Sequence, residues 1–353
     1  MKLGLMVRAR SVWVTAAFAL MVTAIAGFVG RASAADSGDS VTLQGTGATF
    51  PAPLYERWFA EYNKLHPNVQ INYQALGSGA GIKQFQQNLV DFGASDAAMT
   101  DEEMAAVKNG AVLLPMTAGS IVLSYNLPDG PAELKLSREA YVGIFLGKIT
   151  QWDDPAIAKT NPDAKLPATK ITVVTRSDGS GTTFAFTTHL TGISDAWKSG
   201  PGPGKSVNFP VGVAGKGNPG VTALIKQTPG AIGYVEYGYA KQTSMPMATL
   251  ENKAGKFIKP SLESGQKAMA SLALPENRRA WIPDPAGDDS YPIVTYTWLL
   301  CYKKYQDPKV VNTLKSLVQF GLDQGQSYSE ELGYIRLPPQ VIAADKKALD
   351  QIS

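Results

Sequence analysis

Residues 175–184, TRSDGSGTTF, decide how the rest of the sequence is interpreted. They follow the apolar, β-branched run at 171–174, which predicts a strand that ends where the polar residues begin. The segment carries one arginine, one aspartate and a row of glycine, serine and threonine residues. Glycines let a ligand approach the backbone, and hydroxyl groups and a guanidinium add hydrogen-bond donors. Such a loop suits a ligand that accepts many hydrogen bonds.

The same order of strand, small-residue loop and helix occurs twice earlier in the chain. A short apolar strand at 41–43 leads into GTGATFPAP at 45–53, and VQINYQAL at 69–76 alternates like a strand before GSGAG at 77–81. The helices that follow are expected to turn these apolar residues inward: Leu54, Trp58, Tyr62 and Leu65 in the first, and Ile82, Phe85 and Leu89 in the second. The third helix is expected from about Thr183. Three such units predict a parallel α/β sheet with the loops at the carboxyl ends of its strands.

Loops that open helices are suited to anions, because the first backbone N–H groups of a helix have no intrahelical partner and the dipole is positive there. Three such loops could surround one small oxyanion. Taken alone, Arg176 and Asp178 are more typical of a structural ion pair, and Asp96 in VDFGASD is more typical of a helix cap. The shared loop context favours a ligand site for Arg176 and Asp178, and it is the only argument against a helix cap at Asp96.

Several further elements are predicted outside these units. Residues 292–302 are expected to form a buried strand, and 310–323 a helix. The inward face of that helix is expected to consist of Val311, Leu314, Leu317 and Val318. Thr100 and Asp154 are each expected to cap a helix. The Gly/Pro-rich segment at 198–208 is expected to be a surface loop, and 251–290 is weakly patterned, with one helix near 263–273.

The N-terminus has the pattern of a secretory signal peptide at 1–34. A basic start (Lys2, Arg8, Arg10) precedes a mostly apolar run at 11–30 and an A-x-A sequence at 32–34. An uncleaved membrane anchor is the alternative, since the run is near the shortest length that spans a bilayer. No cysteine lies near the cleavage site, which argues against a lipoprotein.

Charge and cysteine content limit the classes of protein. Removing residues 1–34 lowers the Lys and Arg total from 33 to 29 against 30 Asp and Glu, so the mature chain carries a net charge of about −1 and gives no reason to expect nucleic acid. Cys301 is the only cysteine, which excludes an intrachain disulfide. The mature length exceeds what one core usually spans and favours two lobes.

Catalytic and metal motifs are weak. GPGPGKS at 200–206 has Ser199 where a phosphate loop needs glycine, and GTGATF lacks the third glycine of a dinucleotide fingerprint. A serine hydrolase would need a G-x-S-x-G elbow and a histidine base, whereas the only histidines are His66 in a turn and His189 late in a helix. Two histidines and one cysteine do not favour zinc. We therefore expect no enzyme, no metal and no cofactor.

In the loops described above, the sequence resembles a known family, the periplasmic phosphate-binding proteins of high-affinity phosphate ABC transporters. Six segments resemble the family in its order: GTGATFPAPLY, GSGAGIKQ, VDFGASDA, LGKITQWDDPAIAKTNP, TRSDGSGTTF and GKGNPGVTALIKQTPGAIGYVEYGYAKQ. The resemblance extends from about residue 41 to 241 and more loosely through the C-terminal third. Thr46 and the pair Gly79–Ala80 depart from the usual pattern without replacing a matched contact, and 251–290 shows little resemblance.

The resemblance implies a type II periplasmic-binding-protein fold, an α/β fold of two lobes joined by a two-stranded hinge. Residues 35–115 and about 290–353 would form lobe I, and about 116–289 lobe II. One dehydrated phosphate would lie between the lobes. The implied ligand residues are Thr49, Phe50, Ser78, Asp96, Arg176, Ser180, Gly181 and Thr182. Asp178 would form a supporting ion pair with Arg176.

The implied function is capture of inorganic phosphate in the periplasm and its delivery to the permease and ATPase subunits of a phosphate ABC transporter, by a monomer exported through its signal peptide. Two alternatives remain open: a secreted phosphatase or phosphotransferase, and a receptor for another oxyanion such as sulfate or molybdate.

Overall fold

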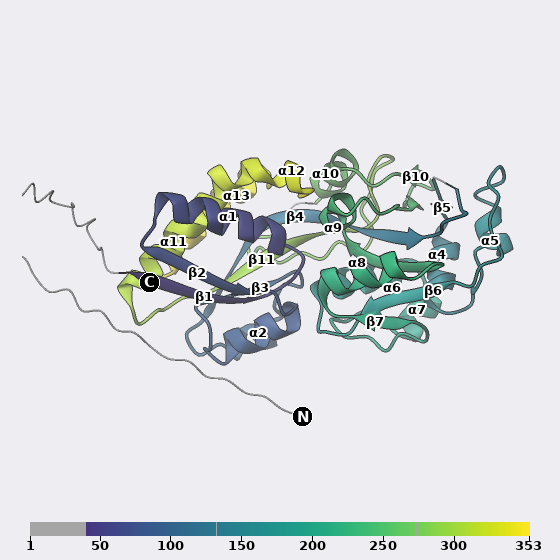
Figure 1. Cartoon of the computed structure of the whole chain (residues 1–353). Coiled ribbons are helices and arrows are strands. Elements are labelled where there is room, and N and C mark those ends of the chain that lie inside the picture. The colour runs from purple at the N-terminus through teal and green to yellow at the C-terminus, as the bar shows by residue number, and fades with distance from the viewer. Residues whose placement is uncertain (1–39, 132, 273) are drawn as a thin grey trace, which may run out of the picture. The chain divides into compact units, whose positions relative to one another are not determined.

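One mixed sheet organises the computed structural model, which describes residues 40–131, 133–272 and 274–353 (Figure 1). The predicted signal peptide at 1–34 lies outside the described residues. Eight strands of the described residues follow the order β2-β1-β3-β11-β4-β8-β6-β7. They are β1 (Val41–Gly47), β2 (Val69–Gln74), β3 (Phe92–Ser95), β4 (Ala111–Asn126), β6 (Thr172–Arg176), β7 (Val213–Gly215), β8 (Ala231–Glu236) and β11 (Val294–Tyr302). A small second sheet contains β5 (Lys135–Leu136), β9 (Thr249–Glu251) and β10 (Phe257–Ile258).

The predicted parallel pairing is present within each half of the sheet, but the sheet as a whole is mixed. β1 pairs in parallel with β2 and β3, and β6 pairs in parallel with β7 and β8. Between these two groups lie β11 and β4, which are antiparallel to their neighbours. The first two strand–loop–helix units are therefore neighbours, whereas the third belongs to the other half of the sheet. The periodicity of a single strand identifies the element but does not fix its neighbours.

Strand β4 belongs to both halves of the sheet. Its residues 111–120 pair with β11, and its residues 121–126 pair with β8. The register with β11 shifts between Thr297 and Trp298, opposite Pro115, which has no N–H to donate to a central strand. The described residues from 40 onward group as one compact unit, so the lobe boundaries expected at about 115 and 290 stay a prediction.

Helices cover the sheet on both faces. α2 packs against β3 and β1, α11 against β1 and α1, and α8 against β8 (Figure 1). The helices are α1 (Ala52–Leu65), α2 (Ser78–Gln86), α3 (Asp101–Ala105), α4 (Arg138–Phe145), α5 (Pro155–Ala158), α6 (Gly181–Ile193), α7 (Asp195–Ser199), α8 (Gly217–Gln227), α9 (Tyr237–Gln242), α10 (Leu262–Ala270), α11 (Pro308–Leu322), α12 (Ser329–Leu332) and α13 (Pro339–Ala348). None of the described helices is long and apolar enough to cross a membrane.

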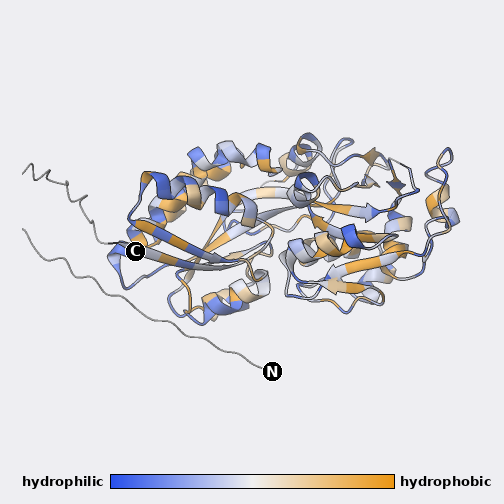
Figure 2. Ribbon diagram, in the orientation of Figure 1, coloured by the Kyte–Doolittle hydropathy of each residue, from blue (hydrophilic) through white to orange (hydrophobic). Residues whose placement is uncertain are grey.

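The predicted inward faces are largely confirmed. Figure 2 shows hydrophobic colour along the strands and a mixture on helices such as α11. The apolar residues predicted inward are buried in α1, α2 and α11, with two exceptions. Leu65 is 58% exposed because it ends α1, and Leu89 is 65% exposed because it lies beyond the end of α2. Asn88 has a left-handed φ of 56°, which turns the chain before Leu89 can continue the helical face.

The predicted helix caps are confirmed. The Thr100 hydroxyl accepts a hydrogen bond from the Glu103 N–H, and the Glu103 carboxylate accepts one from the Thr100 N–H, which makes a capping box at α3. Asp154 accepts from the Ala156 N–H at the start of α5, with Pro155 in the first position. Cys301 is buried and free.

Candidate anion-binding site

The three predicted loops meet where the two halves of the sheet face each other. The Gly77 N–H donates to the Gly47 carbonyl (2.8 Å), and the Gly79 N–H donates to the Gly179 carbonyl (2.8 Å). Gly77 has φ +99°, and a Cβ there would lie 2.2 Å from the Asp178 Oδ2 atom, so only glycine fits. The glycines of these loops therefore allow three backbones to come into direct contact.

Arg176 ends β6, and its side chain is only 1% exposed. Its Nε and Nη2 atoms donate to the two carboxylate oxygens of Asp178 (2.8 and 2.6 Å), and Nη2 also reaches the Thr49 hydroxyl (3.3 Å). Its Nη1 atom is buried and has no hydrogen-bond partner among the described residues. An unpaired charged donor is costly to bury, so this nitrogen marks a place that an acceptor would stabilise.

Asp178 holds the guanidinium in place. Burial alone would raise the pKa of Asp178, but the hydrogen bonds and charge of Arg176 and the Gly217 N–H outweigh burial and lower it. The carboxylate is therefore ionised, and it orients Arg176 so that Nη1 points away from the pair. The predicted ion pair is present in the structure.

Ser180 caps α6 by accepting from the Thr183 N–H (3.0 Å). Gly181 and Thr182 are the first two residues of α6, where backbone N–H groups have no intrahelical acceptor. A Cβ on Gly181 would lie 2.6 Å from the Ser78 Oγ atom and 2.7 Å from the Asp96 Oδ2 atom. The start of α6 thus touches side chains from the other half of the sheet.

Ser78 and Asp96 form the opposite wall. The Asp96 N–H donates to the Ser78 hydroxyl (3.1 Å), and the Thr297 hydroxyl donates to Asp96 Oδ1 (2.9 Å). Burial raises the pKa of Asp96 to about 7, and the Thr297 hydrogen bond and the charge of Arg176 limit the rise. Asp96 follows β3 and does not cap a helix, because the cap of α3 is Thr100. The helix-cap interpretation of Asp96 is therefore wrong.

Thr49 is buried in the loop between β1 and α1. Its hydroxyl oxygen accepts from the Asn218 backbone N–H (3.1 Å), the Asn218 Nδ2 (3.0 Å) and the Arg176 Nη2. The next residue, Phe50, is also buried, and its ring packs edge-on against Tyr334. Phe50 can therefore face a ligand only through its backbone.

Two residues that contact the site were not found by sequence reasoning. Asn218 stands second in α8, after β7 and the glycines Gly215 and Gly217. That order of strand, small-residue loop and helix is a fourth copy of the pattern that identified the other loops, so it could have been found in the same way. Thr297 lies inside the buried strand β11, where no local pattern distinguishes it from a core residue.

The loop at 198–208 also contributes to the site, although it is not a phosphate loop. The Lys205 carbonyl accepts the Ser180 N–H (2.8 Å), and the Lys205 ammonium pairs with Glu103 of α3. The Thr187 hydroxyl accepts from the Gly204 N–H (3.1 Å), which ties the same loop to α6. The loop therefore supports the start of α6 from outside.

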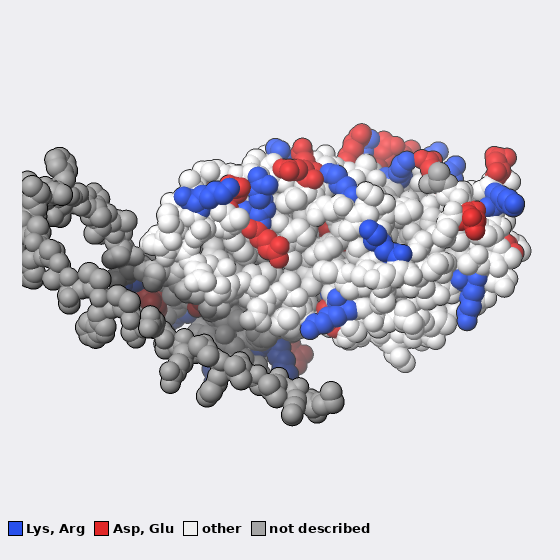
Figure 3. Space-filling model, viewed as in Figure 1, with Lys and Arg blue, Asp and Glu red and all other residues white. Residues whose placement is uncertain are grey.

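His189 is held by hydrogen bonds on both ring nitrogens. His189 is buried between the Tyr141 hydroxyl (2.9 Å) and the Pro283 carbonyl (2.7 Å), and burial lowers its pKa to about 4. Within the described residues no cluster of three or more His, Cys, Asp or Glu side chains is placed to hold a metal. On the face seen in Figure 3, acidic and basic side chains are interspersed.

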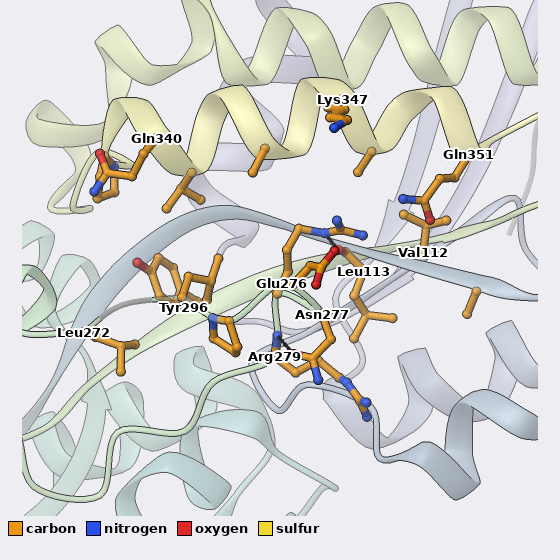
Figure 4. A pocket seen from close by; sticks show the side chains of 18 of the residues that line it. Val112, Leu113, Leu272, Glu276, Asn277, Arg279, Tyr296, Gln340, Lys347 and Gln351 are labelled. Carbon is orange, nitrogen blue, oxygen red and sulfur yellow. Dashed lines mark hydrogen bonds between the residues drawn. The ribbon is translucent and has the colours of Figure 1, made fainter.

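A wide groove lies away from these loops. It is a groove of about 1220 Å³ between α13, β4 and the segment around residues 270–280 (Figure 4). Its lining includes Leu113, Arg279, Tyr296 and Lys347, and none of the predicted ligand residues. The groove is therefore distinct from the predicted anion site.

The chain is similar in sequence to known proteins over most of its length. A family model described as PBP superfamily domain matches residues 32–323. The phosphate-binding protein PstS of Pasteurella multocida is 42% identical over 304 residues, which cover 85% of this chain and 88% of that protein.

Solved structures agree in fold. A high affinity periplasmic phosphate-binding protein bound with phosphate superposes with a TM-score of 0.72 at 20% identity, covering 87% of this chain and 93% of its own. An ABC-type phosphate transport receptor from Vibrio cholerae gives 0.55 at 20% identity, covering 84% and 100%. These likenesses show an α/β periplasmic-binding-protein fold, as the sequence predicts. By its sequence, the chain belongs to the PBP superfamily and, within it, to the family of the phosphate-binding proteins PstS.

Proposed function

We propose that this chain captures inorganic phosphate between the two halves of its sheet and delivers it to an ABC transporter for import. The observation that carries the proposal is the Arg176 Nη1 atom, a buried charged donor with no partner among the described residues. The Ser78 and Ser180 hydroxyls and the first N–H groups of α6 lie in the same set of contacting loops. Such donors are complementary to a small tetrahedral anion that has lost its water.

We assign the ligand contacts to the residues that the family resemblance implies. They are Thr49, Phe50, Ser78, Asp96, Arg176, Ser180, Gly181 and Thr182, with Asp178 orienting the guanidinium. Asp96 fits a ligand that carries a proton, since a carboxylate accepts a hydrogen bond from phosphate but repels fully deprotonated sulfate.

The chain is not an enzyme, because PstS proteins are binding proteins. Its proposed partners are the permease and ATPase subunits of a phosphate ABC transporter. We further propose that it works as a monomer in the periplasm after removal of residues 1–34. The hinge would be the stretch where β4 passes from β11 to β8, because a rotation there separates the two groups of ligand residues.

The test is calorimetry and thermal unfolding of residues 35–353 with phosphate, sulfate, molybdate and citrate. A ligand at ~1,000 Kd should raise the free energy of unfolding by about 4 kcal/mol. We expect this for phosphate and not for the other anions. A larger response to sulfate or molybdate would favour the other-oxyanion interpretation. Turnover of p-nitrophenyl phosphate that is lost in an Arg176 variant would favour a phosphatase.

A further inference from the structure

Asn218 connects the loops of the site without having been assigned a role in it. It is fully buried, and its Nδ2 group donates to the hydroxyls of Thr49 (3.0 Å) and Thr182 (3.2 Å). These two threonines belong to opposite halves of the sheet. One amide therefore contacts a proposed ligand residue on each side of the site.

The orientation of this amide is determined by its other contact. The Asn218 Oδ1 atom accepts the backbone N–H of Glu236 (3.0 Å), and an N–H can only donate. The Nδ2 group must then face the two threonines, and its two hydrogens match the two hydroxyl oxygens. A reversed amide would leave the Glu236 N–H facing another donor.

This orientation of the amide determines whether the Thr49 hydroxyl can donate or accept a further hydrogen bond. A hydroxyl has two lone pairs and one proton. The Thr49 oxygen already accepts from the Asn218 N–H and Nδ2 and lies 3.3 Å from Arg176 Nη2. Its lone pairs are therefore occupied, and its proton is left to be donated.

The other hydroxyls of the site are oriented in a similar way. Ser78 accepts from the Asp96 N–H and donates at 3.4 Å to the Asp96 Oδ2 atom, and Ser180 accepts from the Thr183 N–H. Thr182 accepts from Asn218. Backbone groups thus orient two of the hydroxyls, whereas a side chain orients Thr49 and Thr182.

We propose that Asn218 is a positioning residue for oxyanion binding: by occupying acceptor positions of Thr49 and Thr182, it orients both hydroxyls as donors to the ligand. This inference rests on the proposed function. A site built from donors favours a ligand whose oxygens accept hydrogen bonds, and a hydroxyl that is free to accept would weaken that preference.

The experiment is a pair of double-mutant cycles read by phosphate calorimetry. One cycle combines Asn218→Ala with Thr49→Val, and the matched control cycle combines Asn218→Ala with Ser78→Ala. We expect Asn218→Ala to weaken phosphate binding about tenfold in the wild-type background. The loss should fall to about threefold or less with Thr49→Val, because the hydroxyl that Asn218 orients is already gone, and stay about tenfold with Ser78→Ala.

Equal losses in the two backgrounds would mean that Asn218 only maintains the shape of the site, and the inference would be abandoned. No loss in the wild-type background would have the same consequence. If Asn218→Ala does not fold, Asn218→Leu replaces it, since leucine keeps the branched shape without donor or acceptor. Wild-type protein that binds no phosphate would instead contradict the proposed function, so the two failures are distinguishable.

Discussion

Arg176 with Asp178 and Arg278 with Asp345 are two arginine–aspartate pairs with different geometry. In the first pair, two guanidinium nitrogens meet two carboxylate oxygens at 2.8 and 2.6 Å. In the second, the Arg278 Nε atom lies 3.7 Å from Asp345 and donates instead to the Leu113 carbonyl (3.0 Å). Neither oxygen of Asp345 has a hydrogen-bond partner among the described residues.

The difference shows that a nearby opposite charge does not by itself determine whether a carboxylate is ionised. The pKa of Asp178 is lowered, whereas burial raises the pKa of Asp345 to about 8 and the charge of Arg278 only limits the rise. The aligned pair keeps its charges and leaves Arg176 Nη1 free for a ligand. Arg278 of the loose pair lines the groove described above, yet that pair has no buried donor without a partner among the described residues. The two regions therefore differ in the hydrogen-bond geometry of their arginine–aspartate pairs, although each pair contains one arginine and one aspartate.

Substitution of Asp96, the second carboxylate near Arg176, should cause the largest change in anion binding. Against sulfate the wild-type carboxylate meets only lone pairs, whereas the amide of Asp96→Asn can turn its N–H₂ group toward the anion. A site that bonds a ligand O–H rejects analogues without it by about 10⁴. At pH 9, where a carboxyl with a pKa of about 7 is ionised and phosphate still carries a proton, we therefore expect Asp96→Asn to narrow the phosphate-over-sulfate preference by about a hundredfold, on the order of 3 kcal/mol.

Competition calorimetry with both anions at one pH and salt concentration measures this preference. Because the pKa of Asp96 is about 7, acidification to pH 5.5 should protonate the wild-type carboxyl and also narrow its preference. The asparagine variant should lack that pH dependence. A variant that rejects sulfate as strongly as wild type does would show that Asp96 is not the discriminator.

Arg176→Lys should weaken phosphate binding although the charge is kept. In the proposed site, a planar guanidinium that would engage Asp178 and the ligand together becomes a single ammonium. The loss of one charge-assisted hydrogen bond costs about 1.5–3 kcal/mol, or roughly ten- to a hundredfold in Kd. Arg278→Lys is the matched control and should leave phosphate Kd unchanged. If calorimetry showed the same change in phosphate Kd for both variants, the Arg176–Asp178 pair would have no special role in binding.

Gly181→Ala tests whether contact between the two walls is needed for binding. Its Cβ would overlap Ser78 and Asp96, both from the other half of the sheet, so the loops must separate. Overpacking costs about 1–3 kcal/mol, which corresponds to roughly five- to a hundredfold weaker phosphate binding. Gly192→Ala, near the end of the same helix, meets mainly the Pro283 Cβ atom at 3.1 Å and should bind as wild type does. Unchanged calorimetry of Gly181→Ala would mean that binding does not require this contact.

Sequence patterns predicted the loops of the site better than the sheet that carries them. Local order of strand, glycines and helix identified the segments of Ser78 and Arg176, and family resemblance named their ligand atoms. The position of β6 away from β1 could not be predicted, because β11 comes from nearly 200 residues after β3 and separates the halves. Thr297 was missed for the same reason: its contact with Asp96 is created by long-range antiparallel pairing.

Asp345→Asn should have the smallest effect on phosphate binding and a measurable effect on stability. A buried acid with a raised pKa keeps its proton in the folded state after the unfolded chain has lost it. The folded wild type therefore loses stability as pH rises from about 4 towards the folded pKa of about 8. Asparagine carries no charge, so its free energy of unfolding should not fall in this way. Relative to wild type, the stability of the variant should therefore increase by about 1–3 kcal/mol as the pH rises from 5 to 9.

Asp178→Asn is the matched comparison for Asp345→Asn, and its effect on the free energy of unfolding should have the opposite sign. The pKa of Asp178 is lowered, so its carboxylate stabilises the fold above the unfolded pKa of about 4, and the variant loses stability relative to wild type at neutral pH. Denaturant unfolding at pH 5, 7 and 9 without phosphate measures both differences, and calorimetry checks that Asp345→Asn leaves Kd unchanged. If the Asp345→Asn difference did not grow with pH, its carboxylate would be ionised like that of Asp178. The two arginine–aspartate pairs would then differ only in whether a ligand completes them.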